Sequence, residues 1–268
     1  MARPDAVIKL LYYPTPITVM QAIARYIKTE SRWSRKAIVD TSAGTGEAAK
    51  VLADAWGMDL HGVELDPDRA AELAKVAKVS FCGSYSQIVV GAKNKYSVLF
   101  LNPPYDYARI DDYTVERQEV QFLAAALPLL SAGALVVFVP PSSLLQREEF
   151  RRFVQDHLRD VEFFRFPPDE FKAFGQVVMI AEVGTRWASS DPAEREATWR
   201  KVTNLDTMAV IGEFAPKVVK VGAVAQEYDG RRLYYQTGGC AEDIKVSMTE
   251  VDPAQLCPRR GSKATGAW

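Results

Sequence analysis

The segment from Leu99 to Tyr105 combines residue types that could hold and activate an amino group. An apolar run ends there in Asn102, Pro103, Pro104 and Tyr105. We interpret the run as a buried parallel strand that the two prolines prevent from continuing. The Asn102 side-chain oxygen and the Pro103 carbonyl could each accept one N–H bond of an exocyclic amino group, which favours a tetrahedral, more nucleophilic nitrogen. The Tyr105 ring offers a face on which a base can stack, a contact worth roughly 1–3 kcal/mol.

A second group of candidate residues lies upstream and has the chemistry of a nucleoside site. Asp40 ends a predicted strand, and Ala43, Gly44 and Gly46 follow it before a helical stretch. The glycines allow a tight turn and a close approach of a ligand to the backbone. An acidic residue at the start of this turn suits an ammonium group better than a pyrophosphate. Glu64 ends the next predicted strand, where a carboxylate suits the two hydroxyls of a ribose.

These motifs together resemble the class I S-adenosylmethionine-dependent methyltransferases, and most closely the N6-adenine DNA methyltransferases that carry an Asn-Pro-Pro-Tyr motif. The similarity covers residues 10–183. It implies S-adenosylmethionine as cofactor, DNA as substrate and direct in-line attack by the adenine amino group, with residues 102–105 as the catalytic motif. The cofactor-binding residues that the resemblance implies are Tyr13, Thr15, Pro16, Asp40, Ala43, Gly44, Gly46, Glu64, Leu65, Ser84 and Asn102.

Two of the implied roles fall on residues outside the matching motifs. The family often has an aspartate near the cofactor adenine, and Ser84 stands at that position here. A serine hydroxyl can still bond to a ring nitrogen or an amino group. The resemblance also implies an aromatic residue that holds the face of the target base opposite Tyr105. Phe174 is our candidate for that role, with Phe171 as the alternative.

Strands and helices alternate along the chain, which predicts an α/β fold. We expect a seven-stranded, mostly parallel, Rossmann-like sheet with helices on both faces. A long helix is predicted over residues 115–130, and a strongly apolar strand over 134–139. The last two strands are predicted over 161–166 and 177–183, and the resemblance implies that they are antiparallel to each other.

The chain is predicted to divide into a methyltransferase domain over residues 1–185 and a small C-terminal extension over 186–268. We expect the extension to be a reduced target-recognition region or to be partly disordered. The polar stretch over 187–200 is typical of a linker leading into a short helix. Residues 229–230 read Asp-Gly between two apolar segments, 218–221 and 233–235, which predicts a hairpin.

Composition restricts the possible partners. The 268 residues carry a formal net charge of −1, so any face that neutralises phosphates must be local. Two basic clusters could form it: Arg147, Arg151, Arg152 and Arg165, or Lys217, Lys220, Arg231 and Arg232. The three cysteines show no metal-binding spacing, so no metal is expected. There is no apolar leader or membrane-length run, which predicts a cytoplasmic protein with no membrane contact.

Other functions remain compatible with the same motifs. An Asn-Pro-Pro-Tyr loop can also present a glutamine amide of a protein, or an adenine in RNA. The short segment before Thr15 favours the nucleic-acid branch over the glutamine methyltransferases. A non-catalytic methyltransferase-like binding module is a further alternative, against which the intact Asn102 and Tyr105 argue. An additional specificity subunit or domain is also an expected partner.

Overall fold

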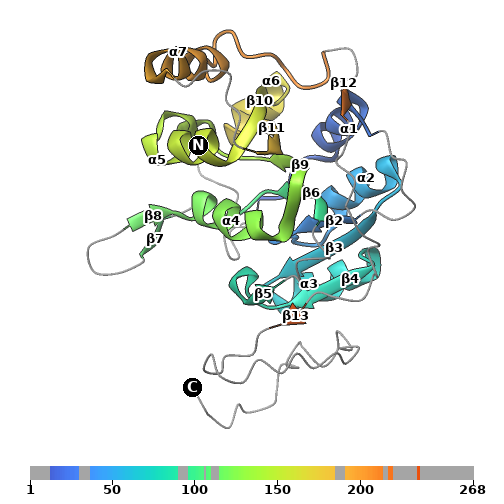
Figure 1. The fold of residues 1–268 in the computed structure, drawn as a ribbon. Coiled ribbons are helices and arrows are strands. Elements are labelled where there is room, and N and C mark those ends of the chain that lie inside the picture. Colours follow the sequence, from blue (N-terminus) through green and yellow to red (C-terminus); the bar gives the residue numbers. More distant parts are fainter. Residues whose placement is uncertain are drawn as a thin grey trace.

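A seven-stranded sheet forms the centre of the molecule (Figure 1). The computed structural model describes residues 13–29, 37–89, 96–105, 107–109, 115–184, 191–213, 217–219 and 234–235. The strand order is β10-β11-β9-β6-β2-β3-β4. The bounds are β2 Ala37–Asp40, β3 Asp59–Glu64, β4 Val79–Cys82, β6 Tyr96–Leu101, β9 Leu130–Phe138, β10 Leu158–Arg165 and β11 Val177–Val183.

The pairing of the strands is parallel except at β11, which runs antiparallel to both β9 and β10. This arrangement confirms the predicted seven-stranded, mostly parallel α/β sheet and the predicted antiparallel pairing of its last two strands. The central strands β2 and β6 are buried along their whole length. That burial explains why both are continuous apolar runs rather than alternating ones.

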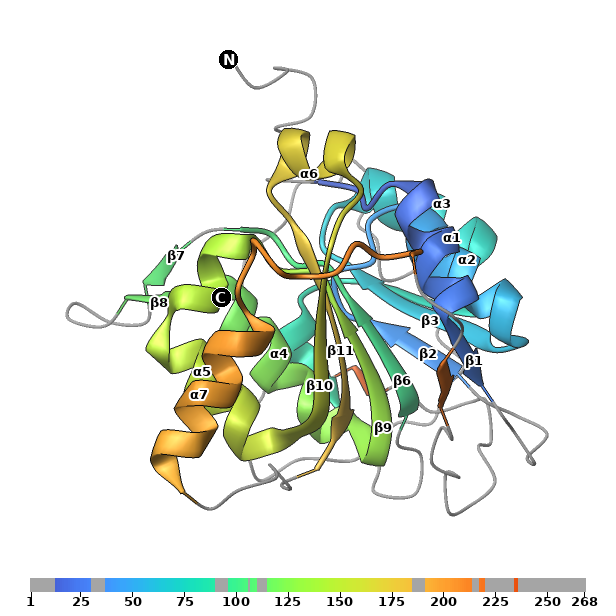
Figure 2. The same ribbon diagram turned by 90° about the horizontal axis from the view of Figure 1, so that it is seen from above.

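Helices cover both faces of the sheet, with α1, α2 and α3 on one face and α4, α5 and α7 on the other (Figure 2). Met20 of α1 and Leu52 of α2 are fully buried in one core cluster, and Phe150 of α5 is fully buried in the other. The helix bounds are α1 Ile17–Tyr26, α2 Glu47–Trp56, α3 Pro67–Val76, α4 Gln118–Ala126, α5 Glu148–His157, α6 Pro168–Phe174 and α7 Pro192–Val202.

Short elements complete the described part of the chain. Their bounds are β1 Ile27–Thr29, β5 Ile88–Val89, β7 Tyr107–Arg109, β8 Val115–Arg117, β12 Lys217–Val219 and β13 Tyr234–Tyr235, with 3-10 helices at Tyr85–Gln87, Leu127–Leu129 and Ser142–Gln146. The turn of the hairpin predicted at residues 229–230 lies outside the described residues, but the strands on either side of it do not form the predicted pair. β12 pairs with β1 and β13 pairs with β5, rather than with each other.

The turn between β2 and α2 depends on a glycine that packs against a neighbouring helix. Gly46 has a φ of +81°, a conformation that other residues rarely adopt. A Cβ added to Gly46 would lie 2.6 Å from Leu73 Cδ1 of α3. The close packing of α3 on this turn therefore requires glycine at position 46.

The predicted helix over residues 115–130 is wrong at both ends. Residues 115–117 form β8, which pairs antiparallel with β7. The helix itself spans Gln118–Ala126, and a 3-10 turn that contains Pro128 follows it. Because proline lacks an N–H and clashes with the preceding turn, it cannot continue the α-helix. The next strand begins at Leu130, before the predicted start at residue 134.

The stretch over residues 187–200 was predicted to be a linker, but most of it belongs to a helix. The Asp191 side chain accepts a hydrogen bond from Ala193 N (2.9 Å), and Pro192 occupies the first turn of α7. An aspartate cap followed by proline is a helix start signal. The linker prediction for residues 192–200 was therefore wrong, because it took the polar composition as the stronger signal.

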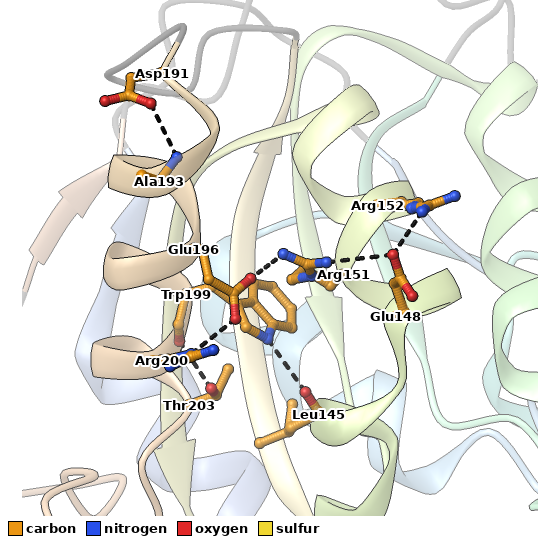
Figure 3. A network of polar contacts seen from close by, with 10 residues as sticks. All are labelled: Leu145, Glu148, Arg151, Arg152, Asp191, Ala193, Glu196, Trp199, Arg200 and Thr203. Carbon is orange, nitrogen blue, oxygen red and sulfur yellow. Dashed lines mark hydrogen bonds and ion pairs between the residues drawn. The ribbon is translucent and has the colours of Figure 1, made fainter.

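Helix α7 packs against the sheet and α5 through one buried tryptophan and a set of ion pairs (Figure 3). Trp199 is 4% exposed, and its ring contacts Phe150 and Phe163 edge-on, with ring centroids 5.9 and 5.6 Å apart. Trp199 Nε1 donates to Leu145 O (3.2 Å). Glu196 pairs with Arg151 of α5 and with Arg200 of its own helix (Figure 3). The division of the chain after residue 185 stays a prediction.

Removing the Trp199 side chain tests how strongly α7 supports the core. We expect Trp199→Ala to lower the free energy of unfolding by about 3–5 kcal/mol, because the change opens a cavity between α7 and the sheet. Urea denaturation would measure this loss. Arg200→Ala is the control, since the Arg200 side chain is 77% exposed, and it should change stability by less than about 0.5 kcal/mol. Equal effects of the two substitutions would contradict the packing role of Trp199.

Candidate active site

A cavity of about 250 Å³ opens at the carboxyl edge of the sheet. The carboxyl ends of β2 and β6 meet the segment that leads into α1 at this edge. Six of the predicted cofactor-binding residues line the cavity, namely Tyr13, Thr15, Pro16, Asp40, Ala43 and Asn102. Glu47 and Phe100 also line it, and sequence reasoning did not single them out. The structure therefore brings together residues that lie far apart in the chain.

Asp40 lies at the end of β2 and is 2% exposed. Its Oδ1 accepts a hydrogen bond from the Ser42 backbone N–H (3.0 Å). Burial raises the pKa of Asp40 to about 7, and the charge of Glu64 adds to this rise, whereas the bond from Ser42 lowers the pKa. No ion pair to Asp40 is found among the described residues, so the buried carboxylate would be stabilised by a cationic partner. An ammonium group in the cavity would supply one.

The glycine-rich turn is fastened to β3 by backbone contacts. Ala43 N donates to Val63 O (2.9 Å), and Gly44 N donates to Glu64 Oε2 (2.8 Å). The side-chain oxygen of Ser42 is buried and has no hydrogen-bond partner among the described residues. Ser42 lines the cavity, so a bound ligand could supply the missing hydrogen bond.

Glu64 ends β3 beside this turn, and two different sets of donors hold its two oxygens. Oε1 accepts from Asp66 N (2.8 Å) and from the Arg69 guanidinium, whose Nη2 lies 2.7 Å away. Oε2 accepts from Gly44 N. A carboxylate oxygen can accept two bonds, so Oε2 keeps capacity for a further donor such as a ribose hydroxyl. Leu65 follows directly and is 63% exposed, an apolar surface next to the carboxylate.

Ser84 follows β4, whose end pairs with the end of β3. The Ser84 and Ser86 hydroxyls are hydrogen-bonded to each other (Oγ–Oγ 2.8 Å). Ser86 N also approaches Ser84 Oγ at 3.3 Å. Ser84 therefore helps to form the turn after β4. Its position at the carboxyl edge is the one that the sequence predicted, and its role toward a cofactor stays a prediction.

Asn102 follows β6, and the start of the described chain fixes the orientation of its side chain. Nδ2 donates to Tyr13 O (2.7 Å) and to Thr15 Oγ1 (2.9 Å). Both amide hydrogens are thereby used, so Oδ1 is the end of the amide that can accept hydrogen bonds from other groups. Oδ1 accepts from the Tyr105 hydroxyl (2.6 Å) and can accept one further hydrogen bond.

The Tyr105 hydroxyl has hydrogen-bond partners besides Asn102. It lies 2.9 Å from Val139 O and accepts from Gln176 Nε2. Burial raises the pKa of Tyr105, so the phenol stays protonated at any physiological pH. The Tyr105 ring is nearly parallel to the Tyr13 ring, at an interplanar angle of 9° and a centroid distance of 5.9 Å.

The structure separates the two phenylalanine candidates for the opposite face of a base. Phe171 is half-buried and packs against both core clusters, and the Arg165 guanidinium lies 5.9 Å from its ring centroid. Phe171 is therefore a core residue. Phe174 is the last residue of α6, and its side chain lies outside the described part of the structure. The assignment of Phe174 stays a prediction.

The basic clusters are less available to phosphates than their sequence indicates. Arg151 and Arg152 both pair with Glu148, and Lys217 pairs with Glu162 (3.1 Å). Arg165 ends β10 at the carboxyl edge of the sheet. The remaining members of the second cluster, Lys220, Arg231 and Arg232, lie outside the described residues.

Sequence reasoning missed two residues that bond directly to the predicted site. Arg69 pairs with Glu64, and Gln176 donates to Tyr105. The signal for Gln176 is its place immediately before β11. An antiparallel strand begins at the edge where its parallel neighbours end, so the residue before it reaches the same edge. The signal for Arg69 is its place in the first turn of the helix after Glu64.

Comparison with known proteins gives one family and several similar folds. The uncharacterised methyltransferase family (DUF6094) matches residues 1–214. A Listeria monocytogenes protein assigned to the class I S-adenosylmethionine-dependent methyltransferases has a TM-score of 0.50 at 11% identity, covering 70% of this chain and 68% of that one. The type IIG restriction endonuclease BpuSI has a TM-score of 0.53 at 16% identity, covering 74% of this chain and 30% of its own. No curated protein sequence matches the chain.

The structural similarities show the fold of the class I S-adenosylmethionine-dependent methyltransferases. The cavity is lined by the buried carboxyl of Asp40 and by Ser42, whose buried hydroxyl has no hydrogen-bond partner among the described residues, and both groups fit the polar methionine end of S-adenosylmethionine. Among the described residues, no helix is both long and apolar enough to cross a membrane. Within the same residues, no three His, Cys, Asp or Glu side chains form a group that could hold a metal ion.

The raised pKa of Asp40 predicts a pH-dependent stability for the cofactor-free protein. The pKa of the Asp40 carboxyl is about 7 in the folded protein, which is above its value in the unfolded chain. The carboxyl therefore contributes stability below about pH 4, and this contribution is lost as the pH rises through 7. We therefore expect Asp40→Asn to raise the melting temperature, with a larger gain at pH 8 than at pH 4.5. Asp206→Asn, at an exposed turn, should show no such difference. An equal gain at both pH values would contradict the burial effect.

Proposed function

Because the chain belongs to the uncharacterised methyltransferase family (DUF6094), we propose that it transfers a methyl group from S-adenosylmethionine to the N6 amino group of adenine in DNA. The observation that carries this proposal is the fixed orientation of Asn102. Its two amide hydrogens bond to Tyr13 O and Thr15 Oγ1, so its oxygen is left to accept from an incoming amino group. An amide oxygen can accept a hydrogen bond from an amino group. It cannot donate one to a carbonyl oxygen, so this arrangement selects an amino group.

The cavity and the edge beside it divide into two parts that suit the two ends of the cofactor. Asp40 would hold the ammonium group of the methionine portion, and Thr15 with the adjoining backbone would hold its carboxylate. Glu64 Oε2 would accept from a ribose hydroxyl, and Leu65 would pack against the adenine. When bound, S-adenosylmethionine supplies a methyl group that its positively charged sulfur makes electrophilic.

The chain's own residues act mainly by orienting the acceptor nitrogen. Asn102 Oδ1 and the Pro103 carbonyl would accept the two N–H bonds of the amino group and direct its lone pair into the cavity. Such alignment contributes much of the acceleration in a transfer between two bound groups. The nitrogen becomes acidic once it carries the new bond, so it can lose a proton afterwards without a strong base. A base inside a duplex must first be extruded, at a cost of a few kcal/mol, and stacking on Tyr105 would offset part of that cost.

DNA is the favoured substrate for two reasons. The aromatic rings of Tyr13 and Tyr105 lie beside Asn102, which suits a planar base better than an aliphatic glutamine. A type IIG restriction endonuclease also shares the fold. We propose that sequence specificity depends on an additional subunit or domain, because Arg151, Arg152 and Lys217 are engaged in ion pairs within the chain.

Transfer of labelled methyl from S-adenosylmethionine to unmethylated DNA tests the substrate. We expect label in N6-methyladenine after nucleoside separation, and a fall of roughly 100-fold in Asn102→Ala, since that variant lacks the oxygen that binds the amino group. Asn204→Ala, at an exposed turn, is the matched control and should keep full activity. Label that appears only in RNA or in a glutamine-containing peptide would overturn the DNA assignment. Cofactor binding without label in any of the three would favour a binding module.

The affinity for S-adenosylmethionine should depend on the ionisation of Asp40. Its pKa of about 7 means that the carboxyl is protonated at lower pH and cannot pair with the cofactor's ammonium group. We expect the dissociation constant to rise towards 10-fold per pH unit below pH 7. Calorimetry between pH 5.5 and 7.5 would measure it. Asp40→Asn should bind weakly and with little pH dependence, and a wild-type affinity that does not change over this range would contradict the assignment.

A further inference from the structure

Gln176 is a buried polar residue that belongs to none of the recognised motifs. It is 1% exposed and precedes β11 at the carboxyl edge of the sheet. Backbone hydrogen bonds fix the chain on both sides of it, from Ser142 N to Gly175 O (2.8 Å) and from Val177 N to Pro140 O (3.0 Å). The Gln176 side chain therefore extends from a rigid backbone, and its Nε2 donates to the Tyr105 hydroxyl.

The Tyr105 hydroxyl has two acceptors for a single hydrogen. Asn102 Oδ1 lies 2.6 Å away and Val139 O lies 2.9 Å away. A phenol donates one hydrogen and accepts with its oxygen, and Gln176 already uses the accepting side. The hydroxyl hydrogen can therefore point to Asn102 or to Val139, while Gln176 holds the oxygen in the same place for both orientations.

The unpaired end of the Gln176 amide argues against a purely structural role. Gln176 Oε1 is buried and has no hydrogen-bond partner among the described residues. An unsatisfied buried acceptor lowers stability, so an apolar side chain of the same size would give a more stable protein. The glutamine is a neutral donor, which can hold the phenol oxygen without competing for the phenol hydrogen. A carboxylate in its place would take that hydrogen from both of the other acceptors.

We propose that Gln176 is a positioning residue that lets Tyr105 release Asn102 for the substrate. This inference rests on the proposed function of Asn102 as the acceptor for an amino group. In the absence of substrate, the Tyr105 hydroxyl donates to Asn102 Oδ1. As the substrate amino group donates to the same oxygen, the hydroxyl hydrogen turns to Val139 O, and the bond from Gln176 keeps the tyrosine ring in position. No covalent bond changes in this step.

A double-mutant cycle with Gln176→Met and Tyr105→Phe tests the proposal. Single-turnover methyl transfer is measured at saturating S-adenosylmethionine, with the best substrate among DNA, RNA and glutamine peptide. We expect Gln176→Met to slow transfer about 10-fold while its cofactor dissociation constant stays within about twofold of the wild type. In the Tyr105→Phe background, the same substitution should have no further effect, because the hydroxyl through which it acts is gone. Gln155→Met, a glutamine substitution on α5, is the control and should leave the rate unchanged.

If Gln176→Met slows methyl transfer by the same factor in the wild-type and Tyr105→Phe backgrounds, the proposal is overturned even though the enzyme is active. An unchanged transfer rate in Gln176→Met would also overturn it. The same cycle measured by urea unfolding detects the Gln176–Tyr105 bond without any substrate. If the wild type transfers methyl to none of the three substrates, the proposed function fails. The unfolding cycle then tests only whether Gln176 and Tyr105 interact. Coupling between the two substitutions would then support the bond, and additivity would overturn it.

Discussion

The contact between Asn102 and the segment before α1 is the constraint on which the site depends. Its two hydrogen bonds join residues 87 and 89 positions apart in the chain. They draw Tyr13 and Thr15 over the carboxyl edge of the sheet, which closes one side of the cavity. The same bonds use both amide hydrogens, so the segment that helps to form the cavity also leaves the oxygen of Asn102 as the end that can accept hydrogen bonds. The cavity and the Asn-Pro-Pro-Tyr loop are therefore parts of one hydrogen-bonded unit.

Two carboxyl groups at neighbouring strand ends behave differently because their surroundings differ. Glu64 is bonded to Arg69 and to two backbone N–H groups, which satisfy much of its charge within the protein. Asp40 has one backbone donor and is more deeply buried, and its pKa rises to about 7. A cation would therefore stabilise the carboxylate of Asp40, whereas Glu64 Oε2 could accept one further hydrogen bond, for example from a hydroxyl. This asymmetry sets the direction in which a molecule with an ammonium group at one end and a ribose at the other would bind.

Much of the fold could be predicted from the sequence, and the exceptions have physical reasons. The strands over 37–40 and 177–183 were predicted with their observed bounds, because a strand buried on both faces is a short apolar run between polar ends. The position of helix α7 was predicted incorrectly, as a short helix after a linker over 187–200, because its apolar contacts are concentrated in Trp199 rather than repeated at helical spacing. The predicted pairing of the strands on either side of residues 229–230 was wrong, because a turn signal does not determine which strands pair. Contacts such as that between Arg69 and Glu64 depend on side-chain orientation, which spacing alone does not give.

The direction of β11 explains why the site contains a residue that motif analysis does not find. Parallel strands deliver the residues that follow them to the carboxyl edge, and this is how Asp40, Glu64 and Asn102 arrive there. β11 runs the other way and delivers the residue that precedes it, Gln176. Because β11 lies between β9 and β10, Gln176 lies next to the segment that follows β9, which contains Val139. The parallel strand β9 brings an acceptor, Val139 O, to the Tyr105 hydroxyl, and the reversed strand β11 brings a donor, Gln176 Nε2, to the same hydroxyl.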